Sequence, residues 1–303
     1  MRGLGVVSTV LVLLIAASGC SGGEESPEPR PATNETSAGS VIDRSDDLVA
    51  VEQTHDVRLG VCALDTGSGD SVEHRPDERF AFASTIKAFL VGALLEQEST
   101  RVLEQEVPIS TDDLEEYAPT VKDALAQGRT TMTVGELADG AVRFSDNAAA
   151  NPLLGLVGGP PGLQEALRAT GDDVTSSSRT EPELNEAVPG DDRDTSTPRA
   201  MVATLEHYTL GEADQGARDT LLDLMRRNTT GDAVIRAGVP AGWEVADKTG
   251  SASYGTRNDI AVVWPPGGAP IVVAILTSRD AQDAGTVDAA IADAMAIVAE
   301  ALS

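Results

Sequence analysis

Several residue types that mark particular classes of protein are scarce in this sequence. Only 3% of its 303 residues are aromatic, so it offers few platforms on which nucleic-acid bases or sugar rings could stack. Its three histidines, His55, His74 and His207, form no H-x-H or H-E-x-x-H pair, which argues against a zinc hydrolase. No internal repeat or coiled-coil heptad is visible. The composition therefore favours a globular protein that uses neither a stacking surface nor zinc.

Positively charged residues and cysteines are also scarce. Lysine and arginine number 22 against 49 aspartates and glutamates, a formal net charge of -27. Repulsion of this size argues against binding to nucleic acid or to an anionic lipid surface. Of the two cysteines, Cys20 lies in the N-terminal leader and Cys62 in the rest of the chain. Because Cys62 has no partner there, no disulfide is expected.

Residues 1–20 have the pattern of an export signal. A basic residue is followed by an apolar run over 6–17, too short to span a bilayer comfortably, and then by small residues up to Cys20. The run A-S-G-C ending at Cys20 resembles the cleavage box of bacterial lipoproteins, although leucine is commoner at the place of Ala17. This resemblance implies a lipid on Cys20 and a membrane anchor facing outside, with ordinary secretion as the alternative. Residues 21–47, rich in Ser, Gly, Glu, Pro and Thr, are predicted to be a disordered tether.

Hydrophobic periodicity places strand patterns at both ends of the remaining chain and helical patterns between them. The expected strands are 57–64, 71–74, 243–248, 260–264 and 271–277, and the helices beside them are 47–53 and 287–302. The expected helices between them include 134–144, 163–169, 198–208 and 217–227. The two ends thus supply one sheet and its covering helices, with a helical segment inserted between them. With 41% hydrophobic residues, the chain can bury such a core.

The motif Ser84-Thr85-Ile86-Lys87 stands where a predicted helix begins. Residues three apart on a helix project from one face, so the amine of Lys87 would lie beside the hydroxyl of Ser84 and could act as its base. The free N–H groups of a helix start could also stabilise an anion formed by attack on a carbonyl. Alone the pattern is weak, because a serine that opens a helix is commonly just its N-cap.

Three further motifs follow in order, and the set is far more specific than any member. They are Ser145-Asp146-Asn147, Glu181-Pro182-Glu183-Leu184-Asn185 and Lys248-Thr249-Gly250. With the first motif, they make the chain resemble the class A serine β-lactamases over roughly residues 45–303. The resemblance implies an α+β, β-lactamase/transpeptidase-like two-lobe fold for a catalytic domain at 48–303. An antiparallel sheet flanked by helices, from 48–80 and 228–303, would pack on an inserted all-α lobe, 81–227, with the active site between the lobes.

The resemblance implies that Ser84 is the nucleophile. Ser84 would attack the lactam carbonyl and become acylated, and its own backbone N–H and that of Ser251 would donate to the oxyanion. Ser145 would relay a proton to the departing lactam nitrogen, with Lys87 and Lys248 holding the relay aligned.

Glu181 and Asn185 distinguish hydrolysis from stable acylation. A carboxylate held with an amide can fix and activate the water that cuts the ester on Ser84, whereas transpeptidases and penicillin sensors lack this pair and stay acylated. The pair predicts turnover and disfavours two alternatives, a penicillin-binding D-Ala-D-Ala peptidase/transpeptidase and a lipid-anchored β-lactam sensor. Whether Lys87, or Glu181 through a water, activates Ser84 stays open. The bond between Glu181 and Pro182 is expected to be cis.

The resemblance also implies contacts with substrate and one structural ion pair. The substrate contacts are Tyr117, Asn147, Asn185, Lys248, Thr249, Gly250, Ser251 and Arg257. Asn147 would hold the acylamino carbonyl, Arg257 with two hydroxyls would hold the carboxylate, and Gly250 would let the substrate backbone approach the strand. Arg179 and Asp194 would form a salt bridge that closes the loop between them.

The implied activity is hydrolysis of the β-lactam ring of penicillins and cephalosporins through an acyl-serine intermediate, which confers resistance to these drugs. The implied partners are the small-molecule substrate and, through the lipid anchor, the membrane. The chain is expected to act as a monomer without metal or cofactor and without nucleic acid.

Overall fold

The computed structural model describes residues 39–212 and 214–303. The predicted export signal with Cys20, and the predicted tether up to residue 38, lie outside these ranges. Within the ranges, no helix has the length and apolar character that crossing a bilayer requires.

The described fold begins before the predicted domain boundary at residue 48. Val41 forms a parallel bridge with Ser71, and helix α1 runs over Ser45–His55. The backbone N–H and the hydroxyl of Ser40 both donate to Asp70 Oδ1, at 2.8 and 2.9 Å. The last residues of the predicted tether are therefore attached to the sheet.

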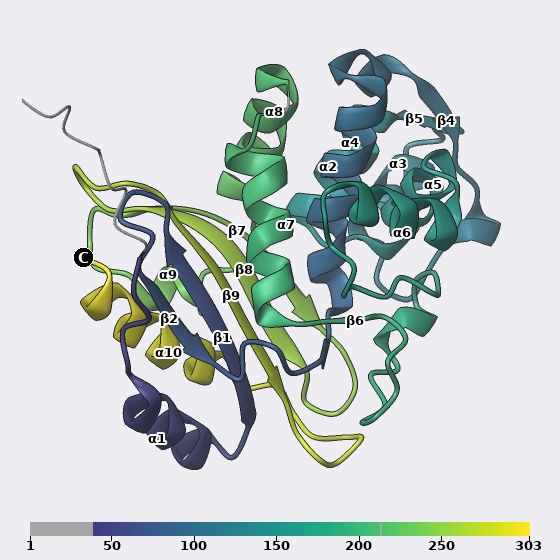
Figure 1. The fold of residues 1–303 in the computed structure, drawn as a ribbon. Helices are drawn as coiled ribbons and strands as arrows, with labels where there is room; N and C mark the ends of the chain where they lie inside the picture. The colour runs from purple at the N-terminus through teal and green to yellow at the C-terminus, as the bar shows by residue number, and fades with distance from the viewer. Residues whose placement is uncertain (1–38, 213) are drawn as a thin grey trace, which may run out of the picture. The chain divides into compact units, whose positions relative to one another are not determined.

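One five-stranded antiparallel sheet joins the two ends of the chain (Figure 1). Its order is β2-β1-β9-β8-β7, so strands far apart in the sequence lie side by side. The strands are β1 (Arg58–Asp65), β2 (Ser71–His74), β7 (Glu244–Ser251), β8 (Arg257–Trp264) and β9 (Ile271–Ser278). Each predicted strand overlaps one of them, which confirms the α+β sheet expected from the sequence.

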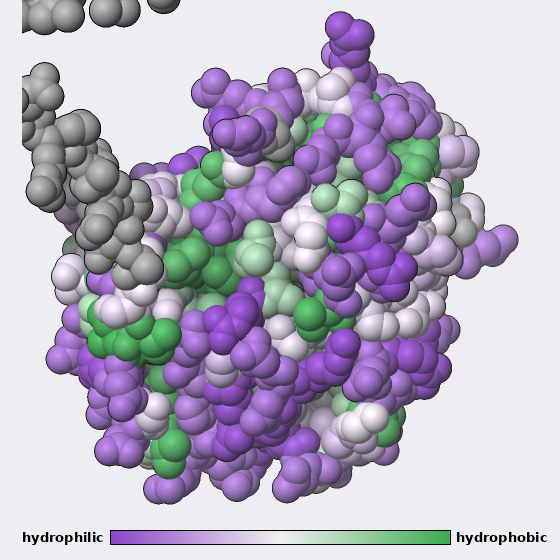
Figure 2. Space-filling model, in the orientation of Figure 1, coloured by the Kyte–Doolittle hydropathy of each residue, from purple (hydrophilic) through white to green (hydrophobic). Residues whose placement is uncertain are grey.

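Apolar side chains alternate between the two faces of this sheet, and helices cover both faces. On one face, Val245, Ala261 and Val273 pack with α1 and α10; on the other, Ala246 and Ile260 belong to the core shared with the helical segment. The covering helices are α1, α9 (Ile235–Gly238) and α10 (Asp288–Ala301) on the first face, and α7 (Pro198–Leu210) and α8 (Gln215–Arg226) on the second. Hydrophilic residues cover most of the outer face drawn in Figure 2.

The inserted helical segment is built around α2 (Ile86–Glu98). Its residues from Ile86 to Leu95 are all buried, as expected of an apolar helix covered on every side. Gly92 allows Tyr208 of α7 to pack closely, because a Cβ at Gly92 would lie 2.6 Å from the Tyr208 ring. Around α2 stand α3 (Pro119–Ala126), α4 (Val134–Arg143), α5 (Asn147–Leu156), α6 (Gly159–Ala169) and the paired strands β4 (Glu106–Pro108) and β5 (Thr131–Thr133).

Short elements complete the fold and refine the predicted helix starts. They are the 3-10 turns η1 (Ala83–Thr85), η2 (Thr100–Glu104), η3 (Thr111–Asp113) and η4 (Glu183–Asn185), and the paired strands β3 (Phe80–Ala81) and β6 (Thr195–Ser196). Ser84 lies in η1, so it is not the side-chain cap of α2. Helix α6 starts before the predicted residue 163, because the prolines of its first turn lack only N–H groups that a helix leaves unpaired there.

Candidate active site

A cleft of about 270 Å³ lies where the end of β7 meets the helical segment. It is lined by Ser84, Tyr117, Ser145, Asn147, Asn185, Thr230, Thr249, Gly250, Ser251 and Arg257. All of these except Thr230 were singled out from the sequence. A larger hollow, of about 690 Å³, lies near the end of α1 and shares no residue with this cleft.

Ser84 is held in η1 by the backbone and by a strand behind it. Its side chain opens into the cleft, although only 7% of the residue is exposed. Asn258 of β8 donates through Nδ2 to the carbonyls of Ala81 at 2.7 Å and Phe82 at 3.2 Å, which ties the turn to the sheet. Ala83 adopts a φ of 49°, in the left-handed region that non-glycine residues rarely occupy. Such strain persists only where the surrounding contacts impose it.

The Lys87 amine lies beside the Ser84 hydroxyl, as the three-residue spacing predicts. Its Nζ is 2.9 Å from Ser84 Oγ, 2.8 Å from the Ser145 carbonyl, 2.7 Å from Asn147 Oδ1 and 2.9 Å from Glu181 Oε1. Burial lowers the pKa of Lys87, while the Glu181 carboxylate opposes that change. Lys87 is thus a buried amine through which four groups of the site are joined.

Glu181 reaches the same hydroxyl from the loop between α6 and α7. Ser84 Oγ donates to Glu181 Oε1 at 3.2 Å, and Asn185 Nδ2 donates to Glu181 Oε2 at 2.5 Å. Asn151 of α5 clamps the Glu181 backbone, donating to its carbonyl at 2.9 Å and accepting from its N–H at 3.0 Å. Asn151 was missed from the sequence, although it lies four residues after Asn147 and so on the same face of α5.

Ser145 completes the centre of the cleft at the start of α5. Lys248 Nζ donates to Ser145 Oγ at 3.1 Å and to the Thr249 carbonyl at 2.7 Å. Burial, and then the positive charge of Lys87, lower the pKa of Lys248 to about 7. The middle residue of this motif, Asp146, caps α5 by accepting from the N–H of Ala149, as the capping interpretation of the motif predicts.

Gly250 has a structural role that the sequence did not suggest. A Cβ at this position would lie 3.0 Å from the Phe82 carbonyl oxygen and 3.1 Å from the Ser84 nitrogen. The absence of a side chain therefore lets β7 approach the turn that carries Ser84. This approach brings Ser84 and Ser251 to the same cleft.

A cationic group and several hydroxyls gather at the far end of the cleft. Arg257 Nη1 donates to Ser251 Oγ at 3.2 Å, and its Nη2 donates to the Thr230 carbonyl at 3.2 Å. The Thr230 and Thr249 hydroxyls are 2.5 Å apart. Asp288 anchors Arg257 by accepting from its Nε at 2.6 Å. This end is suited to an anionic group, and Thr230 is a member of it that no motif pointed to.

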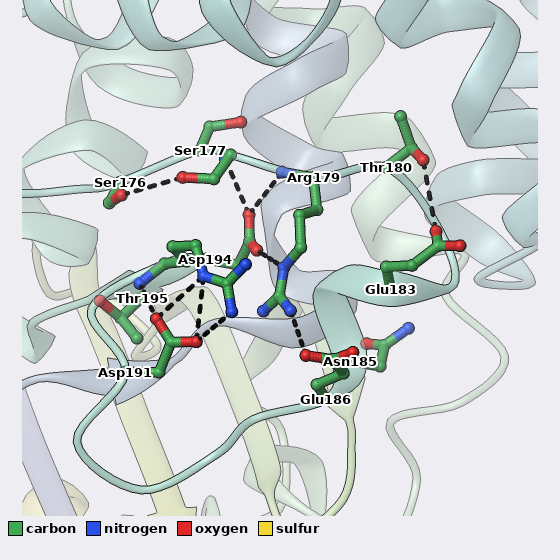
Figure 3. A network of polar contacts seen from close by, with 12 residues as sticks. Ser176, Ser177, Arg179, Thr180, Glu183, Asn185, Glu186, Asp191, Asp194 and Thr195 are labelled. Carbon is green, nitrogen blue, oxygen red and sulfur yellow. Dashed lines mark hydrogen bonds and ion pairs between the residues drawn. The ribbon is translucent and has the colours of Figure 1, made fainter.

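The loop that carries Glu181 is held by the predicted pair of Arg179 and Asp194 (Figure 3). Arg179 Nε donates to Asp194 Oδ2 at 2.5 Å, and the Asp194 side chain is 1% exposed. Asp194 Oδ1 also accepts the backbone N–H groups of Ser178 and Arg179, at 2.8 and 3.0 Å. Arg179 pairs with Glu186 as well. The expected cis peptide between residues 181 and 182 is present.

Taken together, these distances describe a centre able to carry out acyl transfer. A hydroxyl lies within hydrogen-bond reach of both an amine and a carboxylate, and a second hydroxyl lies beside a second amine. Ser84 and Ser251, the two residues expected to stabilise an oxyanion through their backbone N–H groups, both line the same space. The end bearing Arg257 adds positive charge to a chain that is otherwise strongly acidic.

Comparison with known proteins points to one family. The Beta-lactamase enzyme family matches residues 43–302. The Bacillus licheniformis protein "Beta-lactamase" is 48% identical over 297 residues, covering 98% of this chain and 94% of its own length. The "Beta-lactamase" of Amycolatopsis lactamdurans is 55% identical over 257 residues, 84% of each chain.

Solved structures of two related proteins share the fold. The class A β-lactamase of Clostridium kluyveri DSM 555 superposes with a TM-score of 0.82 at 44% identity, covering 84% of this chain and 97% of its own. A halotolerant bacterial β-lactamase superposes with a TM-score of 0.81 at 48% identity, covering 84% of this chain and 98% of its own.

Proposed function

Because this chain belongs to the β-lactamase enzyme family, we propose a role in β-lactam hydrolysis for each residue of its cleft. The protein hydrolyses β-lactam rings as a class A serine β-lactamase. The alternatives of a peptidase/transpeptidase or a drug sensor are not favoured, because the relatives that match nearly the whole chain are β-lactamases.

In the first half of the reaction, Ser84 Oγ bonds to the lactam carbonyl carbon and the ring C–N bond breaks. The Ser84 proton passes to Lys87 or to Glu181, which lie 2.9 and 3.2 Å from Oγ, so either base can take it. Ser145 gives a proton to the departing nitrogen and is replenished through Lys248, 3.1 Å away. The N–H groups of Ser84 and Ser251 hold the oxyanion.

In the second half, Glu181 takes a proton from the water that attacks the acyl carbon. The ester bond to Ser84 then breaks, and the hydroxyl regains its proton. Asn185 donates to Glu181 through Nδ2, while its Oδ1 is buried and has no partner among the described residues. That free acceptor suits a hydrogen of the attacking water. A positioned base of this kind contributes about 10²–10⁴ in rate.

The site holds the substrate through two of its groups, the carboxylate and the acylamino carbonyl. Lys248, Arg257 and the hydroxyls of Thr249 and Ser251 take the substrate carboxylate. Asn147 accepts from Lys87 through Oδ1, which leaves Nδ2 to donate to the acylamino carbonyl. A carboxylate and an acylamino group are shared by penicillins and cephalosporins, and we assign both as substrates.

One observation carries this assignment of roles: the Glu181 carboxylate, braced by Asn185, lies 3.2 Å from the Ser84 hydroxyl. A chromogenic cephalosporin tests it. Steady colour release well beyond one equivalent, with no lasting adduct on Ser84, is expected. One equivalent of stable adduct without turnover would instead support a penicillin-binding protein or a sensor.

We further assign residues 1–20 as an export signal and Cys20 as a lipidated N-terminus, and we assign the protein as a monomer. The A-S-G-C run supports the lipid assignment. The intact mass of the mature protein from membranes checks it, since a diacylglyceryl group adds a defined mass that Cys20→Ala must lack. Sedimentation equilibrium checks the monomer.

A further inference from the structure

The loop that carries Glu181 leaves and rejoins the body of the protein through a neck, formed by residues 174–176 on one side and 194–196 on the other. Ser176 and Thr195 form an antiparallel bridge across this neck, in which the Ser176 N–H donates to the Thr195 carbonyl at 2.9 Å. The loop is therefore closed at its base as well as by the ion pair inside it.

Arg79, which lies outside the loop, joins the two sides of the neck. Its Nη2 donates to the Val174 carbonyl at 2.8 Å on one side, and its Nη1 donates to the Thr195 hydroxyl at 2.9 Å on the other. The Thr195 hydroxyl in turn donates to the Asp192 carbonyl at 2.6 Å. Because a guanidinium holds its donors in a rigid planar fork, this one side chain sets the spacing between the two acceptors.

The segment that begins with Arg79 also carries the nucleophile. Directly after Arg79, strand β3 pairs with β6 in the neck, and the Phe82 N–H donates to the Asp194 carbonyl at 3.1 Å. Ser84 follows two residues later. The separation of 3.2 Å between Ser84 Oγ and Glu181 Oε1 therefore depends on how the neck is seated on this segment.

We propose that Arg79 is a positioning residue for deacylation, which holds the neck against the segment bearing Ser84 and so keeps Glu181 where it can activate water. Arg79 does not line the cleft, so it acts through the loop and not on the substrate. The inference rests on the proposed role of Glu181 in cutting the ester. Acylation should be less sensitive to the neck, because Lys87 lies on α2 and stays beside Ser84 when the loop shifts.

Rapid-quench measurement of acylation and deacylation with a penicillin, well below the unfolding temperature, tests this role in Arg79→Met. This variant keeps a long side chain but removes its donors. We expect deacylation to slow by about tenfold, since a small misplacement of a catalytic group can cost up to about 10²-fold. Acylation should change little.

A second variant probes the same bond from the loop. Thr195→Val removes the acceptor of Arg79 Nη1 and nearly keeps the shape of the side chain, so it should slow deacylation by a smaller factor. Because both variants break one shared bond, the double variant should lose less than the product of the two single effects. Should Arg79→Met fail to fold, Thr195→Val alone decides: a selective loss of deacylation supports the proposal, and an equal loss of both steps overturns it.

Arg199→Met is a matched control beside the same segment. The Arg199 N–H donates to the Pro76 carbonyl at 3.0 Å, but its side chain pairs with Glu73 and Asp77 and not with the neck. Removing this arginine takes away the same charge and two ion pairs, and it should leave both rates unchanged.

Four results would overturn the proposal. They are an unchanged deacylation rate in Arg79→Met, an equal slowing of acylation and deacylation in that variant, an equal loss of deacylation in Arg199→Met, and single effects that multiply in the double variant with Thr195→Val. A lasting adduct on Ser84 in the unchanged protein would refute the proposed function instead, because deacylation would then be missing before any substitution.

Discussion

The two halves of the active site are held in different ways. Ser84, Lys87, Ser145 and Lys248 come from a short turn, a helix, the link between two packed helices and a strand, all anchored in packed cores. Glu181 and Asn185 come from the segment between α6 and α7, whose regular pieces are only η4 and β6. The bond-forming half is thus fixed by packing, and the water-activating half by a few polar contacts. Substitutions should therefore separate acylation from deacylation.

The largest effect is expected where the two halves meet. Ser84→Ala removes the hydroxyl that contacts both Lys87 and Glu181, so hydrolysis should fall by about 10⁴-fold or more. No covalent adduct should appear in the intact mass after incubation with a penicillin. An adduct of the same mass on this variant would place the nucleophile elsewhere.

Breaking the ion pair of the loop should impair its half alone. Asp194→Asn leaves Arg179 without its buried charged partner, and such a loss costs about 3–5 kcal/mol. The acyl-enzyme should then persist, because Glu181 is less firmly placed, while the rate of acylation changes little. Rapid-quench measurement of both steps checks this.

The same loop offers a control for that variant. Asp191 pairs with Arg193 at the surface, where both side chains are more exposed. Asp191→Asn should cost at most about 1 kcal/mol and leave both steps intact. Equal effects of the two variants would mean that the loop is not held mainly by its buried pair.

A substitution in the core of the packed half should lower the stability of the protein without separating acylation from deacylation. Leu94 of α2 is 1% exposed, two turns beyond Lys87. Leu94→Ala should lower the free energy of unfolding by about 2–5 kcal/mol, because it removes buried apolar atoms and leaves a cavity. Below the unfolding transition in urea, the ratio of acylation to deacylation rates should be unchanged. A selective loss of deacylation would contradict the division drawn here.

A further effect depends on pH and falls on substrate capture. Because the pKa of Lys248 is about 7, its ammonium loses its proton as the pH rises above that value. The kcat/KM for an anionic penicillin should then fall by up to about tenfold per pH unit, while deacylation does not follow this ionisation. Lys248→Arg, which stays charged, should flatten the profile.

The same pKa predicts how stability varies with pH. An unfolded lysine titrates near its ordinary value, so between about pH 7 and 10 the unfolded chain binds more protons than the folded one. The contribution of Lys248 to stability should therefore rise with pH through this window. Thermal melts of the protein and of Lys248→Met across the window check the sign.

Much of the packed half could be predicted from sequence because its signals are local. Three-residue spacing places Lys87 beside Ser84, and strong periodicity marks the sheet and the long helices. Helices α3 and α5 were not predicted. Helix α3 has only eight residues, and α5 contains Pro152, a residue that usually ends a helix. The roles of the site residues were predicted through family resemblance. The structure adds Asn151 and Thr230, which no motif indicated.

The missing parts depend on contacts between distant segments. Asn258 donates to the Ala81 carbonyl, 177 residues earlier in the chain. The hydroxyl of Thr230, in a loop, contacts that of Thr249, in strand β7. No local pattern encodes such a meeting. Gly250 lines the cleft, and its service to the substrate stays a prediction; the fold adds that a Cβ there would meet Phe82, Ala83 and Ser84.

The most direct test is the fate of the acyl group in Glu181→Gln, followed by intact mass after mixing with a penicillin. We expect that Ser84 still acquires one acyl adduct and that its release slows by about 10²–10⁴, while the unchanged protein and a variant at the far end of α2, Glu98→Gln, return to their free mass. An adduct that clears from Glu181→Gln as fast as from the unchanged protein would contradict the role of Glu181 in cutting the ester.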